Sequence, residues 1–266
     1  MLLRLLLSSL ALLLSVPIQA TETLRIGGTG SGTALLKLLT KEYLQQYPER
    51  RIELILPTLG SSGGLRALAA GKIDIAISGR PPRADEGQFK TLPFARTPLL
   101  FASDPARNAS DFSLADIADI YAGRRTDWPD GSPIRLVLRS AFESDTITLR
   151  QTSKEMDAAM TQALQNRAGP IGENDLDTVA LIGKLPGALG PTTLGLIRVL
   201  DTRLSIHSIH GVPPTVENML AGRYPLSKRL YLNTRQQQDL ATTDFIAFLN
   251  SPRMRERLLQ LGHAPE

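Results

Sequence analysis

The sequence predicts an α/β protein in which doubly wound sheets carry helices on both faces. Short apolar runs alternate along the chain with longer segments whose apolar residues recur every three or four positions. Turns rich in glycine and hydroxyl side chains join the runs to these periodic segments, as in the βα units of a parallel sheet. With 266 residues, of which 42% are hydrophobic, the chain is long enough for one to three domains with a buried core.

The first twenty residues differ from the rest of the chain. Arg4 is their only charged residue, and residues 5–16 are almost entirely apolar. Pro17 ends this run and Ala20 supplies a small residue at the cut, which is the pattern of a secretory signal peptide. The run is shorter than the roughly 20 apolar residues that span a bilayer. We therefore expect residues 1–20 to be a signal peptide cleaved near Ala20 and the mature protein to be periplasmic, with an uncleaved anchor or a core helix as the alternatives.

Composition limits the kinds of partner that the chain can have. Cysteine is absent, which excludes a disulfide framework, a thiolate metal site and a lipid-attachment cysteine, so we expect a freely soluble protein. The net charge of +4 suits an anionic ligand, but the basic residues are scattered rather than clustered as in a nucleic-acid binder. The aromatic content of 5% also argues against platforms for base stacking, so no nucleic-acid partner is expected.

The first part of the mature chain has a βαβαβ pattern, which predicts a parallel sheet covered by helices. Pro48 ends the first predicted helix, and Gly71 ends the second. The predicted strands cover residues 24–26, 51–56 and 73–78, and the predicted helices cover residues 33–47 and the segment that ends at Ala70.

The second part of the chain predicts another α/β domain. Residues 93–103 are expected to be extended and to leave the first domain, and residues 188–199 to be extended and to return to it. Lobe I is therefore expected to hold residues 21–102 and 200–266, and lobe II residues 103–199. Within lobe II a buried strand is predicted at 134–138 and helices at 114–121, 145–152, 155–166 and 174–183, and a terminal helix pair is predicted at 242–262.

Three loops share a design that can bind an anion. Each joins a strand to a helix and places hydroxyls and backbone N–H groups at the first turn, where the N–H groups are unpaired and the helix dipole is positive. One such loop alone is explained by good N-caps and ordinary turn residues. Three together, at the carboxyl ends of strands in both halves, favour a ligand site in a cleft. The loops are Gly27–Thr33, Gly60–Gly64 and Glu143–Thr146.

Arg139 follows the apolar strand predicted at 134–138, so its side chain is expected to reach the same cleft. A guanidinium stays charged and can hold two oxygens of an oxyanion at once. The alternative is a surface salt bridge, which contributes little.

Three segments resemble the phosphate-binding periplasmic receptors of ABC import systems and their type II solute-binding relatives, and the likeness runs over nearly all of the mature chain. The last two are specific; in the third, a helix leads into a Tyr-Pro-Leu-Ser turn and a strand. The segments are GSSGGLRALAAGKIDIAISGRPP (60–82), LADIADIYAGRRTDWPDGSPIRLVLR (114–139) and GVPPTVENMLAGRYPLSKRLYL (211–232).

This resemblance implies two α/β lobes, joined by two crossover strands, that close on phosphate or a similar oxyanion. It implies delivery of the ligand to an ABC permease. We also expect a monomer without cofactor or metal. The ligand-binding residues that it implies are Thr29, Gly30 and Ser31 in the first loop, Ser61 or Ser62 in the second, and Arg139, Ser144 and Thr146 in the second lobe. Asp145, between the last two, is expected at the site as well.

The sequence departs from the family pattern at two places. Ser78, Gly79 and Arg80 stand where the best-known members have an aspartate that accepts the ligand's proton. Asp145 replaces the glycine of a Ser-Gly-Thr motif, with Glu143 close before it. Asp145 could therefore repel the anion, or it could replace the missing proton acceptor.

Other functions remain open from the sequence. Ser62 fits the short G-x-S-x-G pattern of a serine hydrolase, and His207, His210 and His263 follow it in the chain. His207 and His210 also have the spacing of two metal ligands, but no nearby cysteine or acid completes a set. A sensing or partner-binding protein without a role in transport is the third possibility, because one fold serves many functions.

Overall fold

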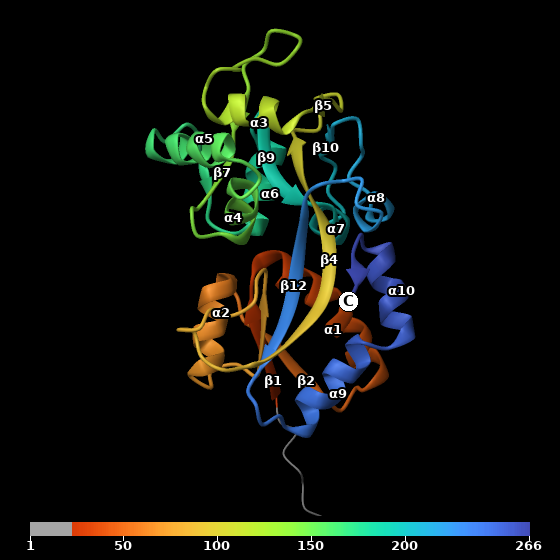
Figure 1. Ribbon diagram of the computed structural model, residues 1–266. Helices are drawn as coiled ribbons and strands as arrows, with labels where there is room; N and C mark the ends of the chain where they lie inside the picture. Colours follow the sequence, from red (N-terminus) through yellow and green to blue (C-terminus); the bar gives the residue numbers. More distant parts are fainter. Residues whose placement is uncertain (1–22) are drawn as a thin grey trace, which may run out of the picture.

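The computed structural model describes residues 23–266 of the chain as two α/β lobes, one above the other in Figure 1. The predicted signal peptide at 1–20 lies outside the described residues. Within residues 23–266, no helix combines the length and the apolar character that crossing a membrane requires.

Lobe I, the lower lobe in Figure 1, begins with the predicted βαβαβ unit. Its strands pair in parallel, with β1 between the other two. The first helix buries Leu35, Leu36 and Leu39 against the sheet and ends just before Pro48, as the pattern predicts. The elements are β1 (Thr23–Gly28), α1 (Gly30–Gln46), β2 (Arg51–Leu54), α2 (Gly60–Ala69) and β3 (Ile75–Ser78).

Lobe II, the upper lobe, has its own core around Phe101, Trp128, Val137 and Leu189. Most of its helices, but not α4, begin at residues whose side chains cap them: Ser113 Oγ accepts a hydrogen bond from Asp116 N in a full capping box. The elements are β5 (Asp111–Phe112), α3 (Leu114–Tyr121), β6 (Arg135–Leu136), β7 (Leu138–Arg139), α4 (Ser144–Arg150), α5 (Lys154–Gln165), β8 (Ile171–Gly172), α6 (Asp175–Lys184), β9 (Ala188–Thr193) and α7 (Leu194–Val199).

Two segments of lobe II differ from the prediction. The strand predicted at 134–138 is divided, because β6 pairs with β9 whereas β7 pairs with β8. The segment predicted to be extended at 188–199 is a strand only as far as Thr193. Thr193 Oγ1 then accepts a hydrogen bond from Leu196 N and begins α7, and a short apolar run of this kind does not distinguish strand from helix by periodicity.

The segment after residue 200, which was expected in lobe I, first packs on lobe II. Strand β10 (Ser205–Ile206) pairs with β4 (Lys90–Ser103), β11 (Ser208–Ile209) pairs with β5, and α8 (Val216–Leu220) follows. Ile209, Met219 and Leu226 belong to the same buried core as Trp128. We therefore propose that lobe II continues to about residue 226 and that the return to lobe I is made by β12 (Ser227–Thr234).

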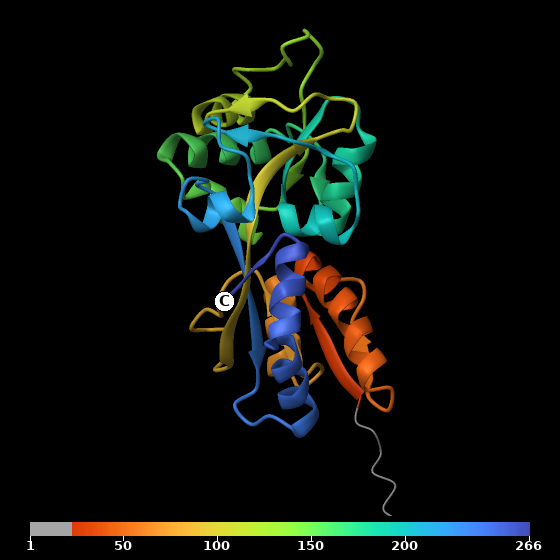
Figure 2. The same cartoon turned by 90° about the vertical axis from the view of Figure 1, so that its right-hand side faces the viewer.

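The C-terminal helices complete lobe I, and the predicted helix pair is confirmed. Phe245 and Leu258 pack with Leu230 of β12 in the core of this lobe. Figure 2 shows these helices next to α1 on one side of the sheet. The elements are α9 (Leu240–Leu249), α10 (Pro252–Gln260) and β13 (Ala264–Pro265).

Two antiparallel strands, β4 and β12, connect the lobes (Figure 1). The first part of β4, up to Pro98, pairs with β12, and its last part, from Leu99, pairs with β9 of lobe II. The sheets are thus hydrogen-bonded into one mixed sheet of order β2-β1-β3-β12-β4-β9-β6. The carboxyl ends of β1, β3 and β7 face one another where the lobes meet, which is where an open α/β sheet binds its ligands.

Candidate functional site

The first turn of α1 contributes donors from lobe I to a buried site between the lobes. Thr29 has extended backbone angles at the N-cap, and its hydroxyl donates a hydrogen bond of 2.9 Å to Asp175 Oδ2. The backbone N–H of Ser31 donates to the same oxygen at 2.9 Å. An unpaired N–H at a helix N-terminus favours an anionic acceptor, and here that acceptor is a carboxylate of lobe II.

Arg139 of β7 is the first of two buried cations at this site. Its NH1 group donates to Thr178 Oγ1 at 3.0 Å and to Gly172 O at 3.3 Å. Its NH2 group lies 3.0 Å from Glu143 Oε2 and 3.4 Å from Asp175 Oδ1. Arg139 was predicted from the sequence to enter the cleft, and these contacts place its guanidinium there, with a side chain that is 1% exposed.

Lys228 of β12 is the second buried cation, and the sequence did not identify it as a site residue. Its ammonium nitrogen lies 2.7 Å from Asp145 Oδ1 and 2.9 Å from Asp175 Oδ1. Its side chain points to the same face of the strand as the buried residues Leu230 and Leu232. A lysine on the buried face of an alternating strand is rare unless it is paired, so this spacing was a usable signal.

The ionised groups at the site shift one another's pKa values. Burial opposes the ionisation of Asp175, but Lys228, Arg139 and the donated hydrogen bonds outweigh it and hold the pKa of Asp175 below its ordinary value. Burial raises the pKa of Glu143, an effect that Arg139 only partly offsets. Burial also opposes the charges of Arg139 and Lys228, yet the surrounding carboxylates raise the pKa of both.

The second predicted loop touches the site through Gly79. Ser61 Oγ accepts a hydrogen bond of 2.9 Å from Gly79 N, and a methyl group at Gly79 would lie 2.5 Å from Ser144 Oγ. The loops after β3 and β7 are therefore in close contact across the cleft. Ser61 and Ser144, predicted as ligand-binding residues in different lobes, lie on either side of this contact.

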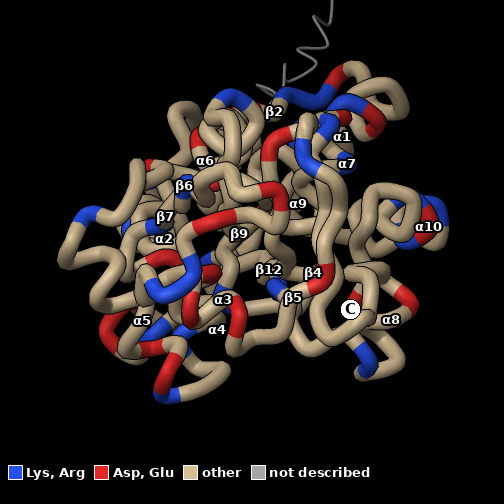
Figure 3. The backbone as a smooth tube through the Cα atoms, turned by 90° about the horizontal axis from the view of Figure 1, so that it is seen from above, with Lys and Arg blue, Asp and Glu red and all other residues tan. Residues whose placement is uncertain are grey.

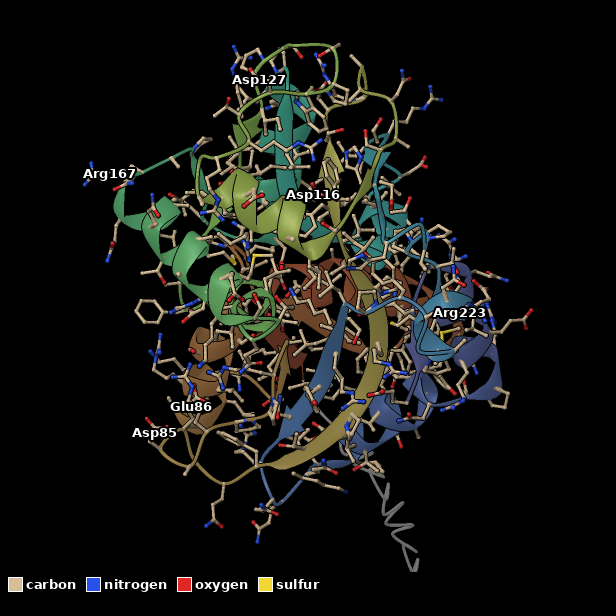
Figure 4. The ribbon with its side chains drawn as sticks, turned by 45° about the horizontal axis from the view of Figure 1, so that its top comes forward. Asp85, Glu86, Asp116, Asp127, Arg167 and Arg223 are labelled. Carbon is tan, nitrogen blue, oxygen red and sulfur yellow. The ribbon has the colours of Figure 1, made fainter. Side chains whose placement is uncertain are left out.

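Ser62 is engaged in a different interaction. Its hydroxyl accepts a hydrogen bond of 2.8 Å from Arg80 NH2, and Arg80 also pairs with Glu86 at 2.5 Å. Figure 4 shows Glu86 on the loop beside α2, next to Asp85. Arg80 thus has its own counter-ion, and this interaction lowers the pKa of Glu86 to about 2.

Several buried polar atoms near the site remain without a hydrogen-bond partner among residues 23–266. Ser31 Oγ, Arg139 Nε and Thr146 Oγ1 are in this group, and each belongs to a residue predicted from the sequence to bind the ligand. Buried polar atoms are nearly always paired in folded proteins, so these unpaired atoms are groups that a ligand could use.

Most of the predicted site residues therefore meet between the lobes, whereas Ser62 contacts Arg80. Gly30 allows the close approach of the two lobes, because a methyl group there would lie 3.1 Å from the Asp175 carboxylate. Asp175 itself was not predicted. It is the first residue of α6, where an acidic side chain is a routine helix-stabilising choice and gives no sign of a site.

The geometry does not support the two alternatives that involve histidine, a serine hydrolase at Ser62 and a metal site at His207 and His210. Ser110 N donates to His207 Nδ1 at 3.0 Å, and His207 Nε2 lies 2.9 Å from Ser103 Oγ, in the core of lobe II. His263 Nδ1 pairs with Leu261 O at 3.0 Å. Burial lowers the pKa of both rings to about 4, so both are neutral at pH 7, and the Ser62 hydroxyl pairs with Arg80 instead. Residues 23–266 contain no group of three His, Asp or Glu side chains arranged to hold a metal ion.

Comparison with known proteins gives concordant matches. A family model described as a PBP superfamily domain matches residues 15–253 of the chain. The phosphate-binding protein PstS of Bacillus subtilis is 23% identical over 256 residues, which cover 93% of this chain and 82% of the relative.

Two solved structures share the architecture. A putative phosphate ABC transporter substrate-binding protein from Clostridium perfringens, with bound phosphate, has a TM-score of 0.78 at 19% identity and covers 92% of this chain and 100% of its own. An ABC-type phosphate transport receptor from Vibrio cholerae has a TM-score of 0.63 at 20% identity, with coverages of 91% and 99%. These likenesses confirm the two-lobed type II periplasmic binding protein fold that the sequence predicted.

Proposed function

The chain belongs to the PBP superfamily, and we propose that it is an exported receptor that captures phosphate or a similar small oxyanion between its lobes for an ABC importer. The relatives and structures with which it aligns over most of its length are named as phosphate-binding proteins. The proposal includes delivery to an ABC permease by a monomeric, periplasmic protein.

One observation carries this proposal. Two buried cations, Arg139 and Lys228, and the first turn of α1 converge on a single carboxylate, that of Asp175. A carboxylate is itself an oxyanion, and the donors that surround it are those that a phosphate group requires: a helix N-terminus, a hydroxyl, an ammonium and a guanidinium. Along the backbone, Lys and Arg are interspersed with Asp and Glu (Figure 3).

The region after β3 indicates how selectivity differs from that of a receptor with an aspartate there. Ser78 Oγ donates to Arg80 O at 2.7 Å and accepts from Asn233 Nδ2 of β12 at 2.9 Å, so its proton is already donated within the protein. The carboxylates near the site are those of Glu143, Asp145 and Asp175. A carboxylate that accepts the proton of a protonated oxyanion would come from these three.

Calorimetry on protein stripped of ligand by unfolding and refolding tests the proposal, with phosphate, arsenate, sulfate and small carboxylates as titrants. At a hundredfold excess over Kd, a ligand bound only by the folded protein adds about 2.7 kcal/mol to the free energy of unfolding. For a chain of this size, that gain raises Tm by roughly 5–10 °C. Wild-type protein that binds none of these anions and shows no rise in Tm would overturn the proposal.

A further inference from the structure

The side chain of Asp175 occupies the position that an oxyanion would take. It begins α6 in lobe II and reaches the first turn of α1 in lobe I. Oδ2 accepts hydrogen bonds from the Thr29 hydroxyl and from Ser31 N, both at 2.9 Å. Oδ1 lies 2.9 Å from Lys228 Nζ and 3.4 Å from Arg139 NH2. The strongest anion-binding groups of the cleft thus share one internal partner.

An oxyanion and the Asp175 carboxylate cannot use these donors at the same time. A backbone N–H donates along one direction, and that of Ser31 points at Asp175 Oδ2. The space is also filled, because a methyl group added at Gly30 would lie 3.1 Å from both Cβ and Oδ2 of Asp175. A ligand that uses the helix N-terminus therefore requires the carboxylate to leave.

The charge of the cluster leads to the same conclusion. Two cations, Arg139 and Lys228, face three carboxylates, those of Glu143, Asp145 and Asp175. Adding a dianion to a buried group that already holds more carboxylates than cations would leave negative charge without a partner, which is strongly unfavourable. Replacing one carboxylate by the ligand avoids most of this cost.

We propose that Asp175 is a built-in competitor of the ligand: its carboxylate fills the anion position between the lobes, and an oxyanion binds only by displacing it. The inference rests on the proposed function and names the residue that limits affinity at that site. The contact between the helices does not depend on the carboxylate alone, because Ala34 of α1, Val179 of α6 and Leu196 of α7 form an apolar cluster among the same elements.

The competitor lowers the apparent affinity by the fraction of molecules whose anion position is free. It also keeps Arg139 and Lys228 paired while no ligand is bound, which avoids two uncompensated buried charges. A side chain truncated at position 175 should therefore raise the affinity for oxyanions. Because the effect arises from occupancy of the site, it should depend on the size of the residue as well as on its charge.

Three variants separate these contributions. Asp175→Ala removes the carboxylate and leaves the position empty. Asp175→Asn replaces the carboxylate by a neutral amide of the same shape. Asp177→Asn removes a charge from the same turn of α6, where the hydrogen bond that the Asp177 side chain accepts within residues 23–266 comes from Glu173 N. Phosphate and sulfate are titrated into each stripped variant and into wild type by calorimetry, and folding is checked by urea unfolding.

We expect Asp175→Ala to tighten phosphate and sulfate binding by about tenfold or more, which corresponds to a competent fraction of about one in ten or less in wild type. Asp175→Asn should tighten binding by less than the alanine variant, and Asp177→Asn should change it by less than about twofold, as for a screened charge outside the site. Equal or weaker binding by both position-175 variants would overturn the inference.

The wild-type titration keeps this inference apart from the proposed function. If wild type binds phosphate and the position-175 variants do not bind it more tightly, Asp175 is not a competitor and the receptor function stands. If only the variants bind, the competitor is real and the wild-type chain is not an oxyanion receptor. Absence of binding in all of them overturns both proposals.

Discussion

Lys228 Nζ lies 2.7 Å from Asp145 Oδ1 in an ion pair whose two side chains are each 2% exposed. The pair joins a strand that connects the lobes to the first turn of α4 in lobe II. Asp145 is therefore paired with a cation that it shares with Asp175, whereas the sequence alone presented it as a group facing the ligand. The effect of Asp145 on a bound anion therefore depends on the charge of Lys228 as well as on its own.

Lys228→Met should lower the free energy of unfolding by about 3–5 kcal/mol, because Asp145 and Asp175 then lose a buried partner. Adding Asp145→Asn to this variant should restore part of the loss, since one of the two unpaired carboxylates is then gone. Urea unfolding of both variants measures these changes, with exposed Lys72→Met as a control expected within about 0.5 kcal/mol of wild type. A loss below about 1 kcal/mol for Lys228→Met would show that the pair is not important for stability.

Gly79→Ala should weaken phosphate binding by about tenfold or more, because the added methyl group would hold the loops of the two lobes apart. A cost of about 1.4 kcal/mol for bringing the lobes together corresponds to a factor of ten in Kd. The methyl group would lie 2.5 Å from Ser144 Oγ and 3.1 Å from Lys228 Cε. Gly183→Ala on the exposed face of α6 is the matched control. It meets Leu204 at an ordinary 3.5 Å and should stabilise the helix by roughly 0.5–1 kcal/mol without changing binding. Unchanged affinity in Gly79→Ala would mean that this contact does not form in the bound protein.

The fold could be predicted from the sequence wherever local patterns and packing agree. Helix α1 could be predicted from two signals, the spacing of the leucines that it buries and the proline that follows its end. The sequence failed for the segment after Thr193, where four apolar residues fit strand and helix equally well until the hydroxyl of Thr193 caps a helix. It also failed to place residues 205–226, because the short pairings of β10 and β11 depend on contacts distant in the chain.

The site was predictable in part. Thr29, Ser31 and Arg139 lie at or just after strand ends, and that position brings the Thr29 hydroxyl, the Ser31 N–H and the Arg139 guanidinium to the site. Lys228 could have been found, since it alternates in register with buried Leu230 and Leu232. Asp175 could not, because Asp175 and Asp177 look alike as acidic residues in a first helical turn, and only tertiary packing brings one of them to α1.

The buried ring of His207 should make the protein less stable in mild acid. Its folded pKa of about 4 lies below the unfolded value of about 6.5, so the unfolded chain takes up the proton first as the pH falls. Stability is therefore lost between about pH 6.5 and pH 4, by about 2 kcal/mol between pH 7 and pH 5 for this one group. Protonation would also place a hydrogen on Nδ1, which accepts from Ser110 N.

Urea unfolding at pH 7 and pH 5 checks this assignment. His207→Gln keeps a donor and an acceptor but does not titrate, so its loss of stability should be smaller than that of wild type by about 2 kcal/mol. His210→Asn, at an exposed position with a φ of 53° that asparagine tolerates, should leave the acid loss unchanged. The same acid loss in His207→Gln and wild type would assign the effect to other groups.

The mature protein is expected to begin at or near Thr21 and to be recovered from the periplasm. The prediction depends on the leucine-rich leader and the small residue Ala20 before the cut. The intact mass of protein released by osmotic shock measures it directly. A replacement of Ala20 by a bulky residue should slow the processing, whereas a cytoplasmic protein that retains residues 1–20 would contradict the prediction.

Arg139→Lys should weaken phosphate binding by about tenfold or more, because the lysine keeps the charge but loses the planar fork that can serve two oxygens at once. In wild type NH1 is held by Thr178 and Gly172, NH2 faces Glu143 and Asp175, and Nε is buried without a partner among residues 23–266. Arg139→Ala should bind more weakly still and should also lose about 3–5 kcal/mol of stability, since the buried carboxylates then lack this cation. Titrations below the Tm of each variant separate loss of binding from loss of folding, and the lysine variant decides if the alanine variant does not fold.

Exposed Arg135→Lys on the adjacent strand β6 is the control and should bind phosphate as wild type does. If Arg139→Lys matches that control for every oxyanion tested, Arg139 holds the lobe together but does not bind the ligand.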